Sequence, residues 1–349
     1  MSKIVKIGNV SIGGGNKVAV QSMCNIKTSD AERVIGQIRE LEDVGCDVIR
    51  VSVKDEDDIN ALKTIKKNIR IPLVADIHFN YRYALKAIDA GVDKIRINPG
   101  NIGGENNVAE VAAALKSSGV AVRVGSNSGS VEKTLLARYG KSEISLAESA
   151  LKNVAVLEKY GVENIVVSAK ASNVVLTKKT YEYLSKKTDY PLHVGVTEAG
   201  TLASGTIKSA IGIGSLLLEG IGDTIRVSLT ADPKEEIYAA RRILRSVNLE
   251  TDYAEVISCP TCGRTEYDSI TLANKVEALT ANVKKPLKIA VMGCVVNGPG
   301  EAKDCDIGIA GGSGYCAFFK KGEVYKKVPF ADAEKEFIKE IELLAESYR

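Results

Sequence analysis

Three of the seven cysteines in this 349-residue chain have the spacing of a metal site. Cys259 and Cys262 form a C-x2-C pair, and Cys294 follows them further along the chain. Thiolates arranged in this way bind zinc or an iron–sulfur cluster. The spacing leaves three interpretations open: a four-cysteine zinc site completed by Cys305, an iron–sulfur cluster, and a redox dithiol.

The fourth ligand of such a site is sought among Cys305, Cys316 and the carboxylate of Glu301. Residues 293–301, GCVVNGPGE, are rich in glycine and predict a loop that turns its backbone amides toward a bulky group. Amide hydrogen bonds to sulfide would raise the reduction potential of a cluster held there.

A second set of residues combines aliphatic side chains with arginine. Arg50, Arg96, Arg123 and Arg226 each stand between two aliphatic residues, and Lys170 ends another apolar run. Because side chains alternate along a strand, each arginine faces away from its aliphatic neighbours. Five converging cations require an anion, and a guanidinium group binds phosphate through two parallel hydrogen bonds. We predict a phosphate ligand, with internal ion pairs or filled barrel layers as the alternative.

Other polar residues stand where apolar runs end. They are Asp76, His78, Asn98, Asn127, Thr197 and Glu198. His78 follows Asp76 by two residues and is expected on the same side, as an acid, a base or a substrate contact. His193 lies within an apolar run and is expected to be structural.

The elements that would position these side chains form a repeating pattern. Eight apolar runs alternate with amphipathic helical segments, at the spacing of βα units. The runs are Val18–Met23, Val48–Val53, Pro72–His78, Lys94–Gly100, Val120–Asn127, Asn164–Lys170, Pro191–Glu198 and Asp223–Thr230. Eight such units predict an α/β fold, a TIM (β/α)8 barrel. Its active site is expected at the carboxyl ends of the strands.

After about residue 250 the pattern changes to that of a smaller α+β domain. We therefore predict two domains: residues 1–248, a TIM barrel that binds the phosphate ligand, and residues 249–349, a metal or iron–sulfur domain. An insertion within residues 130–142 is expected on the active-site side of the barrel.

Composition excludes several classes of protein. Hydrophobic residues make up 45%, charged residues 26%, and the formal net charge is +3. No basic block predicts nucleic-acid binding, and no apolar segment is long enough for a membrane span or a signal peptide. The cysteines are then expected to be reduced, in a cytoplasmic protein.

Several motifs together resemble one enzyme family. CPTCGRT, MGCVVNGPGEA and DIGIAGG in the second domain are similar to those of the bacterial-type 4-hydroxy-3-methylbut-2-enyl diphosphate synthases of the non-mevalonate isoprenoid pathway. The resemblance continues through the barrel in VAVQSM, VADIHF, IRINPGNIG, VRVGSNSGS, VSAKAS, GVTEAG and GDTIRVSLT. It covers essentially the whole chain and matches the short two-domain form.

The resemblance implies one 4Fe–4S cluster and a cyclic diphosphate substrate. The cluster ligands would be Cys259, Cys262, Cys294 and Glu301. The substrate, 2-C-methyl-D-erythritol 2,4-cyclodiphosphate, would undergo reductive ring opening and dehydroxylation by two single electrons from flavodoxin or ferredoxin. Its binding residues would be Arg50, Arg96, Asn98, Arg123, Asn127, Lys170, Thr197, Arg226 and Asn297.

The resemblance also implies individual roles and an assembly. Glu198 would donate a proton, Asp76 would orient a hydroxyl group, and His78 would assist. A head-to-tail homodimer would share its active sites between subunits. A different class of function stays open beside this one: a phosphate-binding, aldolase-like barrel with a zinc knuckle, in which Lys170 forms a Schiff base.

Overall fold

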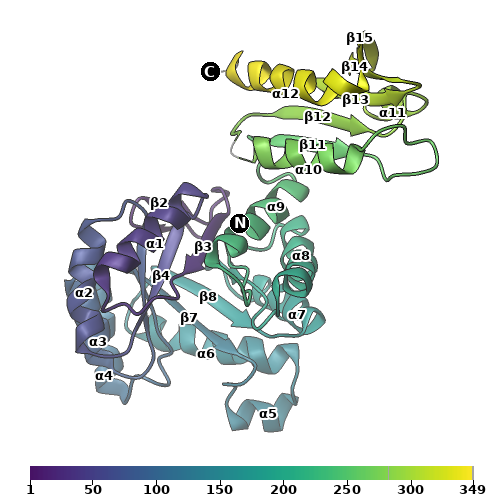
Figure 1. The fold of residues 1–349 in the computed structure, drawn as a ribbon. Coiled ribbons are helices and arrows are strands. Elements are labelled where there is room, and N and C mark those ends of the chain that lie inside the picture. The colour runs from purple at the N-terminus through teal and green to yellow at the C-terminus, as the bar shows by residue number, and fades with distance from the viewer. Residues whose placement is uncertain (282, 348–349) are drawn as a thin grey trace. The chain divides into compact units, whose positions relative to one another are not determined.

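The computed structural model of the protein describes residues 1–281 and 283–347 (Figure 1). The chain divides into two compact units, Met1–Leu249 and Glu250–Arg349.

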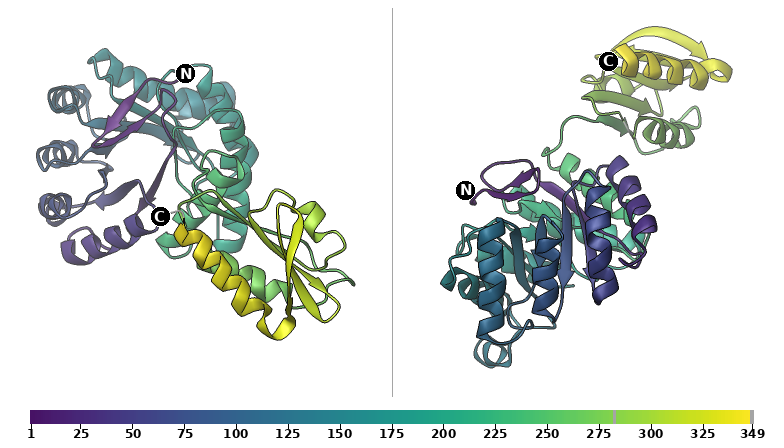
Figure 2. Two further views of the ribbon diagram at one scale, coloured as in Figure 1. Left: turned by 90° about the horizontal axis from the view of Figure 1, so that it is seen from above. Right: turned by 90° about the vertical axis from the view of Figure 1, so that its left-hand side faces the viewer.

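The first unit is a parallel barrel surrounded by helices, as the sequence predicted (Figure 2). Its sheet has the order β8-β7-β6-β5-β4-β3-β10-β9, and a parallel bridge between Val167 and Leu192 joins the two ends. The strands are β3 (Ala19–Met23), β4 (Val48–Val53), β5 (Leu73–Ile77), β6 (Lys94–Arg96), β7 (Ala121–Asn127), β8 (Ile165–Lys170), β9 (His193–Val194) and β10 (Thr224–Ile225). The helices are α1 (Ala31–Asp43), α2 (Glu56–Lys67), α3 (Tyr81–Asp89), α4 (Glu105–Ser118), α5 (Lys133–Tyr139), α6 (Glu143–Lys159), α7 (Val174–Ser185), α8 (Leu202–Leu218) and α9 (Pro233–Ser246). Helix α5 lies within the predicted insertion.

Local signals in the sequence set the helix boundaries. Asp30 and Asp232 cap the first turns of α1 and α9 by accepting backbone N–H groups, and Pro233 occupies the first turn of α9. Proline suits this position because its missing N–H would have no partner within the helix. Gly119 ends α4 with a φ of 70°, which glycine adopts without steric cost.

A short hairpin closes one end of the barrel, a feature that the sequence pattern did not predict. Strands β1 (Val5–Ile7) and β2 (Val10–Ile12) are antiparallel. Their buried side chains join one apolar cluster with residues near the amino ends of barrel strands: Ala19, Val48, Val74, Ala121 and Val166. Ligands therefore have access to the lumen from the opposite end, where the strands end.

Three strands are shorter than the apolar runs that predicted them. β6 ends at Arg96, β9 at Val194 and β10 at Ile225. Beyond β6, Pro99 has no N–H to donate to a ladder. Beyond β9, Glu198 has a φ of 51°, outside the range of a strand. The remaining residues of these runs form loops at the carboxyl end of the barrel.

The second unit is a five-stranded sheet of order β11-β12-β13-β14-β15, parallel at first and antiparallel from β13 onward. Its elements are β11 (Ala254–Ser258), α10 (Ser269–Thr280), β12 (Leu287–Met292), α11 (Gly298–Glu301), β13 (Ile307–Gly312), β14 (Tyr315–Lys320), β15 (Glu323–Pro329) and α12 (Phe330–Ser347). The hairpin of β14 and β15 turns at Lys321 and Gly322, which both have positive φ. This is the backbone of a two-residue hairpin turn.

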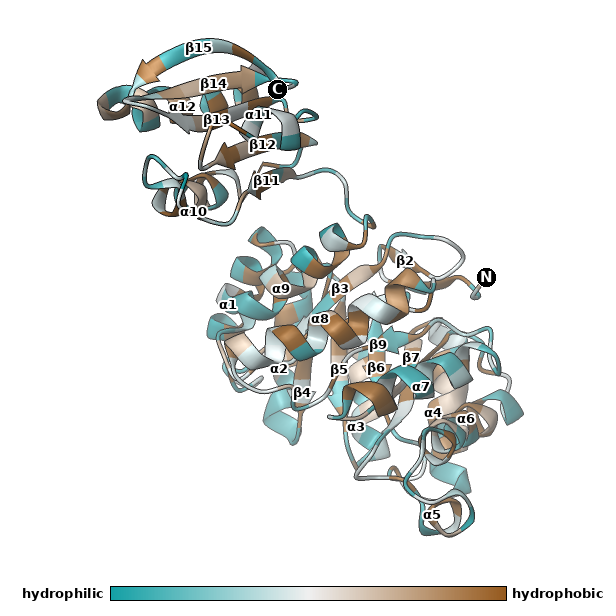
Figure 3. Ribbon diagram, turned by 90° about the vertical axis from the view of Figure 1, so that its right-hand side faces the viewer, coloured by the Kyte–Doolittle hydropathy of each residue, from teal (hydrophilic) through white to brown (hydrophobic). Residues whose placement is uncertain are grey.

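Helix α8 carries apolar residues on its exposed surface as well as toward the core (Figure 3). Ile207, Ile211 and Leu218 are all more than half exposed. Within the part of the chain that the structure describes, no helix combines the length and apolar character required to cross a membrane.

Candidate functional site

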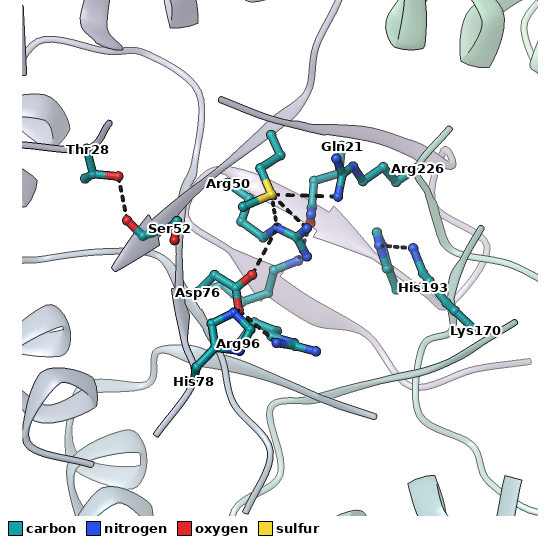
Figure 4. A network of polar contacts seen from close by, with 12 residues as sticks. Gln21, Thr28, Arg50, Ser52, Asp76, His78, Arg96, Lys170, His193 and Arg226 are labelled. Carbon is teal, nitrogen blue, oxygen red and sulfur yellow. Dashed lines mark hydrogen bonds and ion pairs between the residues drawn. The ribbon is translucent and has the colours of Figure 1, made fainter. Parts of the chain in front are cut away.

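Charged side chains from neighbouring strands meet at the carboxyl end of the barrel (Figure 4). Asp76 on β5 is the register partner of Arg96 on β6, and Arg96 is the partner of Arg123 on β7. Arg50 on β4 is the partner of Val74, two residues before Asp76. Because residues two apart share one face of a strand, these four side chains line the same lumen.

Asp76 is the anionic centre of this group. Its Oδ1 lies 3.1 Å from Nη1 of Arg96 and 3.9 Å from Nε2 of His78, and its Oδ2 lies 3.6 Å from Nε of Arg50. Burial alone would raise the pKa of Asp76, but the arginines, led by Arg50, lower it below its ordinary value. Asp76 is therefore a carboxylate that orients two guanidinium groups.

Arg50 and Arg226 share an uncharged partner. The Sδ atom of Met23 lies 3.1 Å from Nε and 2.9 Å from Nη2 of Arg50, and 3.8 Å from Nη1 of Arg226. Burial lowers the pKa of Arg50 to about 10. Arg226 also faces Glu236 of α9, whose Oε2 is 3.6 Å from Nε of Arg226 and accepts a hydrogen bond from Ser22 Oγ.

Arg123 is buried without the partners that a guanidinium group requires. Only 3% of the residue is exposed, and its Nε and Nη1 have no hydrogen-bond partner among the described residues. Burial and the neighbouring Arg50 and Arg96 lower its pKa well below the ordinary value. Unpaired buried donors are costly, so this position favours an anion that accepts from both.

Lys170 ends β8 with its ammonium group beside a histidine. Its Nζ lies 3.2 Å from Nε2 of His193, and both residues are buried. Burial and the neighbouring Arg123 lower the pKa of Lys170 well below its ordinary value. A lysine in contact with water would keep its ordinary pKa. Burial in the barrel wall therefore sets the pKa of this amine.

Cations outnumber anions among the lumen residues described here. The cations are Arg50, Lys94, Arg96, Arg123, Lys170 and Arg226, and the carboxylates facing them are Asp76 and Glu236. Sequence reasoning did not identify Lys94 or Glu236. Lys94 begins β6, is fully buried and donates to Gln21 Oε1 at 3.2 Å. Lys94 stands two residues before Arg96, and this spacing is the sequence signal that would have placed it on the lumen face. Glu236 belongs to a helix, and its sequence carried no such signal.

The other predicted barrel residues lie on loops at the same end. Asn98 Oδ1 accepts from Gly100 N at 3.1 Å, which shapes the loop after β6. Asn127 ends β7 and is exposed, as is His78. Glu198 is exposed and has a φ of 51°, a left-handed conformation that side chains disfavour. Such strain concentrates at functional sites. Thr197 is half-buried beside it, and its N–H donates to Ala171 O.

In the second unit, the cysteine loops leave adjacent parallel strands at the same edge of the sheet. Cys259 follows β11 and Cys294 follows β12. The N–H of Gly293 donates to Cys259 Sγ at 3.0 Å, so the two loops are in contact. Cys262 is exposed, and its N–H donates to Thr265 Oγ1.

Asn297 and Glu301 lie on the segment that follows Cys294. Asn297 is the residue before α11 and accepts the N–H of Glu301, which ends this short helix. Both side chains are exposed. Gly298 is buried against β12 and β13, where an added Cβ would lie 2.8 Å from that of Met292. The close packing holds α11 on the sheet at the edge that carries the cysteines.

Three thiols and one carboxylate on adjoining loops suit an iron–sulfur cluster by donor chemistry. Among residues 1–281 and 283–347, however, no group of three His, Cys, Asp or Glu side chains is drawn together as metal ligands. The structure thus places the four candidate ligands on one edge without closing them into a ligand set.

Cys305 and Cys316 differ from the three loop cysteines in their burial. Both are fully buried within the sheet domain, and burial raises the pKa of each thiol to about 11. Cys24 and Cys46 of the barrel are likewise buried, as expected for small apolar side chains. Buried thiols of high pKa are poor thiolate ligands, so Cys305 is disfavoured as the fourth ligand.

Solved structures of distant sequence share the fold. The dihydropteroate synthase of Yersinia pestis superposes with a TM-score of 0.50 at 13% identity, covering 71% of this chain and 100% of that one. The dihydropteroate synthase of Coxiella burnetii in complex with pteroic acid gives the same values. At this identity the likeness concerns the fold alone.

Curated proteins of similar sequence match nearly end to end. The 4-hydroxy-3-methylbut-2-en-1-yl diphosphate synthase (flavodoxin) of Caldanaerobacter subterraneus subsp. tengcongensis is 58% identical over 343 residues, covering 98% of this chain and 97% of that protein. The synthase of the same name from Clostridium perfringens is 54% identical, covering 97% and 98%.

Two family models account for both units. Residues 2–241 match the GcpE TIM-barrel domain, and residues 255–343 match the GcpE protein C-terminal domain. This chain therefore belongs to the GcpE family.

Proposed function

We infer that this chain is the enzyme for which its curated relatives are named. It converts 2-C-methyl-D-erythritol 2,4-cyclodiphosphate to 4-hydroxy-3-methylbut-2-enyl diphosphate in the non-mevalonate isoprenoid pathway. Ring opening and dehydroxylation consume two electrons, delivered singly, and two protons, and they release one water. The observation that carries this inference is the surplus of buried cations in the barrel lumen, because it calls for a multiply charged anion.

The barrel unit binds the diphosphate. Arg123, with two unpaired N–H donors, accounts for the strongest demand for an anion, and Lys170 adds an ammonium group from the next strand. Arg50 and Arg96 are pre-oriented by Asp76, which limits the entropy lost when they bind phosphate. Arg226 and the loop residues Asn98, Asn127 and Thr197 complete the binding site in this proposal.

Glu198 is the proton donor in this proposal, and Asp76 and His78 orient a substrate hydroxyl group. The positive φ of Glu198 supports its role, since a strained backbone persists where it holds a side chain in a required direction. His78 lies near Asp76 on the exposed side of the ion pairs, where it can meet a ligand that enters from the mouth.

The second unit holds one 4Fe–4S cluster through Cys259, Cys262, Cys294 and Glu301. The bound cluster would supply single-electron transfer. A carboxylate is a harder and more labile iron ligand than a thiolate, so Glu301 would leave one position open to exchange. Asn297, three residues after Cys294, would contact substrate beside it. The adjoining loops and the N–H donated to Cys259 Sγ support this assignment.

The electron donor in this proposal is flavodoxin, as in the names of the curated relatives, or ferredoxin. The active protein is a cytoplasmic homodimer that shares its active sites between subunits, as the resemblance implies. Dimerisation would remove exposed apolar surface such as that of α8 from water. Sedimentation of the full chain tests this part directly.

The deciding experiment is purification without air, followed by metal and sulfide analysis. We expect brown protein with about four iron and four sulfide per chain, and product from the cyclodiphosphate with reduced flavodoxin. Glu301→Ala should abolish turnover while its affinity for inorganic pyrophosphate stays at the wild-type value. Colourless protein with one zinc ion and no turnover would reject the proposal and favour the aldolase-like alternative.

A further inference from the structure

The wall of the barrel beside Lys170 contains two hydrogen-bonded residues, His193 and Thr224, to which the function described above gives no role. Nε2 of His193 lies 3.2 Å from Lys170 Nζ, and Nδ1 of the same ring lies 2.7 Å from Thr224 Oγ1. His193 and Thr224 are both fully buried, on neighbouring strands β9 and β10. Figure 4 shows the His193 ring and the Lys170 side chain facing each other.

The charge states of these groups determine the direction of the hydrogen bonds. Burial, together with Lys170, Arg123, Lys94 and Arg50, lowers the pKa of His193 well below its ordinary value, so the ring is neutral. In its protonated state Lys170 has donors only, so Nε2 then accepts from it. The ring proton then lies on Nδ1 and donates to Thr224 Oγ1.

A tyrosine ties together the two strands that carry this contact. Tyr181 Oη accepts the N–H of Ala169, the residue before Lys170, at 3.1 Å. The same hydroxyl group donates to the carbonyl oxygen of His193 at 2.6 Å. Tyr181 is fully buried on α7, so its position is set by packing. The backbone positions of Lys170 and His193 are thus linked through one hydroxyl group.

Gly195 provides the space that the ammonium group occupies. A Cβ built on Gly195 would lie 2.8 Å from Lys170 Nζ and 2.4 Å from the carbonyl oxygen of Arg226. Its backbone does not have positive φ, so a conformational requirement does not explain this glycine. The close approach of the Arg226 carbonyl oxygen and of the Lys170 side chain explains it.

We propose that His193 is a positioning residue for Lys170, and that it directs the ammonium group at the substrate diphosphate through a neutral acceptor. The proposal rests on the function inferred above. Arg50 and Arg96 are oriented by a carboxylate, which offsets part of their charge. A neutral imidazole orients the protonated Lys170 without offsetting its charge toward phosphate oxygens.

The test measures the affinity of the full chain for inorganic pyrophosphate by calorimetry, which does not depend on turnover. His193→Phe keeps a ring without an acceptor and should weaken binding about tenfold, the effect of losing a hydrogen bond to a charged group. His193→Gln retains an acceptor and should restore affinity to within about threefold of wild type. KM for the cyclodiphosphate should follow these changes, with kcat altered less.

A double-mutant cycle separates positioning from general damage to the fold. If His193 acts through Lys170, His193→Phe has no further effect on affinity in a Lys170→Met background. Thr224→Val should weaken binding about threefold by releasing the ring. Thr180→Val is its matched control, because Thr180 is equally buried and donates to Leu176 O within its own helix, not to His193. Its affinity should be unchanged.

Unchanged pyrophosphate affinity in His193→Phe, or effects that add to those of Lys170→Met, would overturn the proposal. If His193→Phe does not fold, equal affinities of Thr224→Val and Thr180→Val have the same consequence. A different result would reject the inferred enzyme activity. If the protein shows these affinity changes but does not convert the cyclodiphosphate, His193 still positions Lys170 and only the inferred reaction is wrong.

Discussion

Asp76 Oδ1 and Arg96 Nη1 lie 3.1 Å apart, and the two residues are register partners on adjacent strands. Asp76 also faces Arg50, so one buried carboxylate holds two half-buried cations. Asp76 thereby keeps the guanidinium groups of the cationic lumen aligned.

Asp76→Asn should destabilise the barrel unit by about 3 kcal/mol at pH 7, because it leaves two half-buried guanidinium groups without their buried anion. It should also raise KM for the cyclodiphosphate. Since the folded pKa of Asp76 is lowered, its contribution exists above the ordinary pKa of aspartate and is lost as the pH falls through the folded pKa. Urea titrations should show the difference narrowing below about pH 4.

The control for this variant is Glu40→Gln, which breaks the exposed pair with Lys234. It should change the free energy of unfolding by less than about 1 kcal/mol. An Asp76→Asn chain that is as stable as Glu40→Gln would show that the lumen pairs contribute little.

Arg123→Met should change stability and binding in opposite directions. Removing a buried guanidinium group with two unpaired donors should raise Tm, while affinity for inorganic pyrophosphate should fall by about tenfold or more. Arg33→Met, at an exposed position of α1, serves as the control and should alter neither quantity. A lower Tm with unchanged affinity would identify Arg123 as an internal packing residue instead.

Lys94→Met should stabilise the barrel, more at pH 7 than at pH 10. Burial lowers the pKa of Lys94, so the folded chain holds this proton less tightly than the unfolded chain does. This cost is present below the unfolded pKa of about 10.4 and disappears as the pH approaches it. Thermal unfolding at the two pH values, with the exposed Lys86→Met as control, measures the effect. A gain that does not depend on pH would contradict the assigned cause.

Variants of Glu198 distinguish the backbone strain at this position from the chemical role of its carboxyl group. Glu198→Gln should lower kcat by about a hundredfold if the carboxyl group donates a proton, with Tm unchanged. Glu198→Gly should lower kcat similarly but raise Tm, because glycine adopts a φ of 51° without steric cost. A glycine variant with unchanged Tm would show that the left-handed backbone is unstrained.

Cys305→Ala should keep the iron and sulfide of the protein purified without air, whereas Cys259→Ala should lose both. The reason is that Cys305 is a buried thiol of raised pKa, while Cys259 lies on the loop in contact with Gly293. Loss of iron in Cys305→Ala, with the fold intact by circular dichroism, would restore Cys305 as a ligand.

The order of apolar runs was enough to predict the barrel, because parallel strands buried on both faces leave continuous aliphatic stretches. The arginine within four of these stretches was enough to predict a cationic lumen, since alternation along a strand is a local rule.

Only the tertiary structure brought Glu236 of α9 to Arg226 and joined His193 to Lys170 and Thr224. These contacts connect residues far apart in sequence, and periodicity does not specify which helix residue reaches into a barrel or which buried polar groups meet. His193 looked like a structural residue from its neighbours alone. Its partners emerged once β8, β9 and β10 were side by side, because closure of the sheet sets the distance between their side chains.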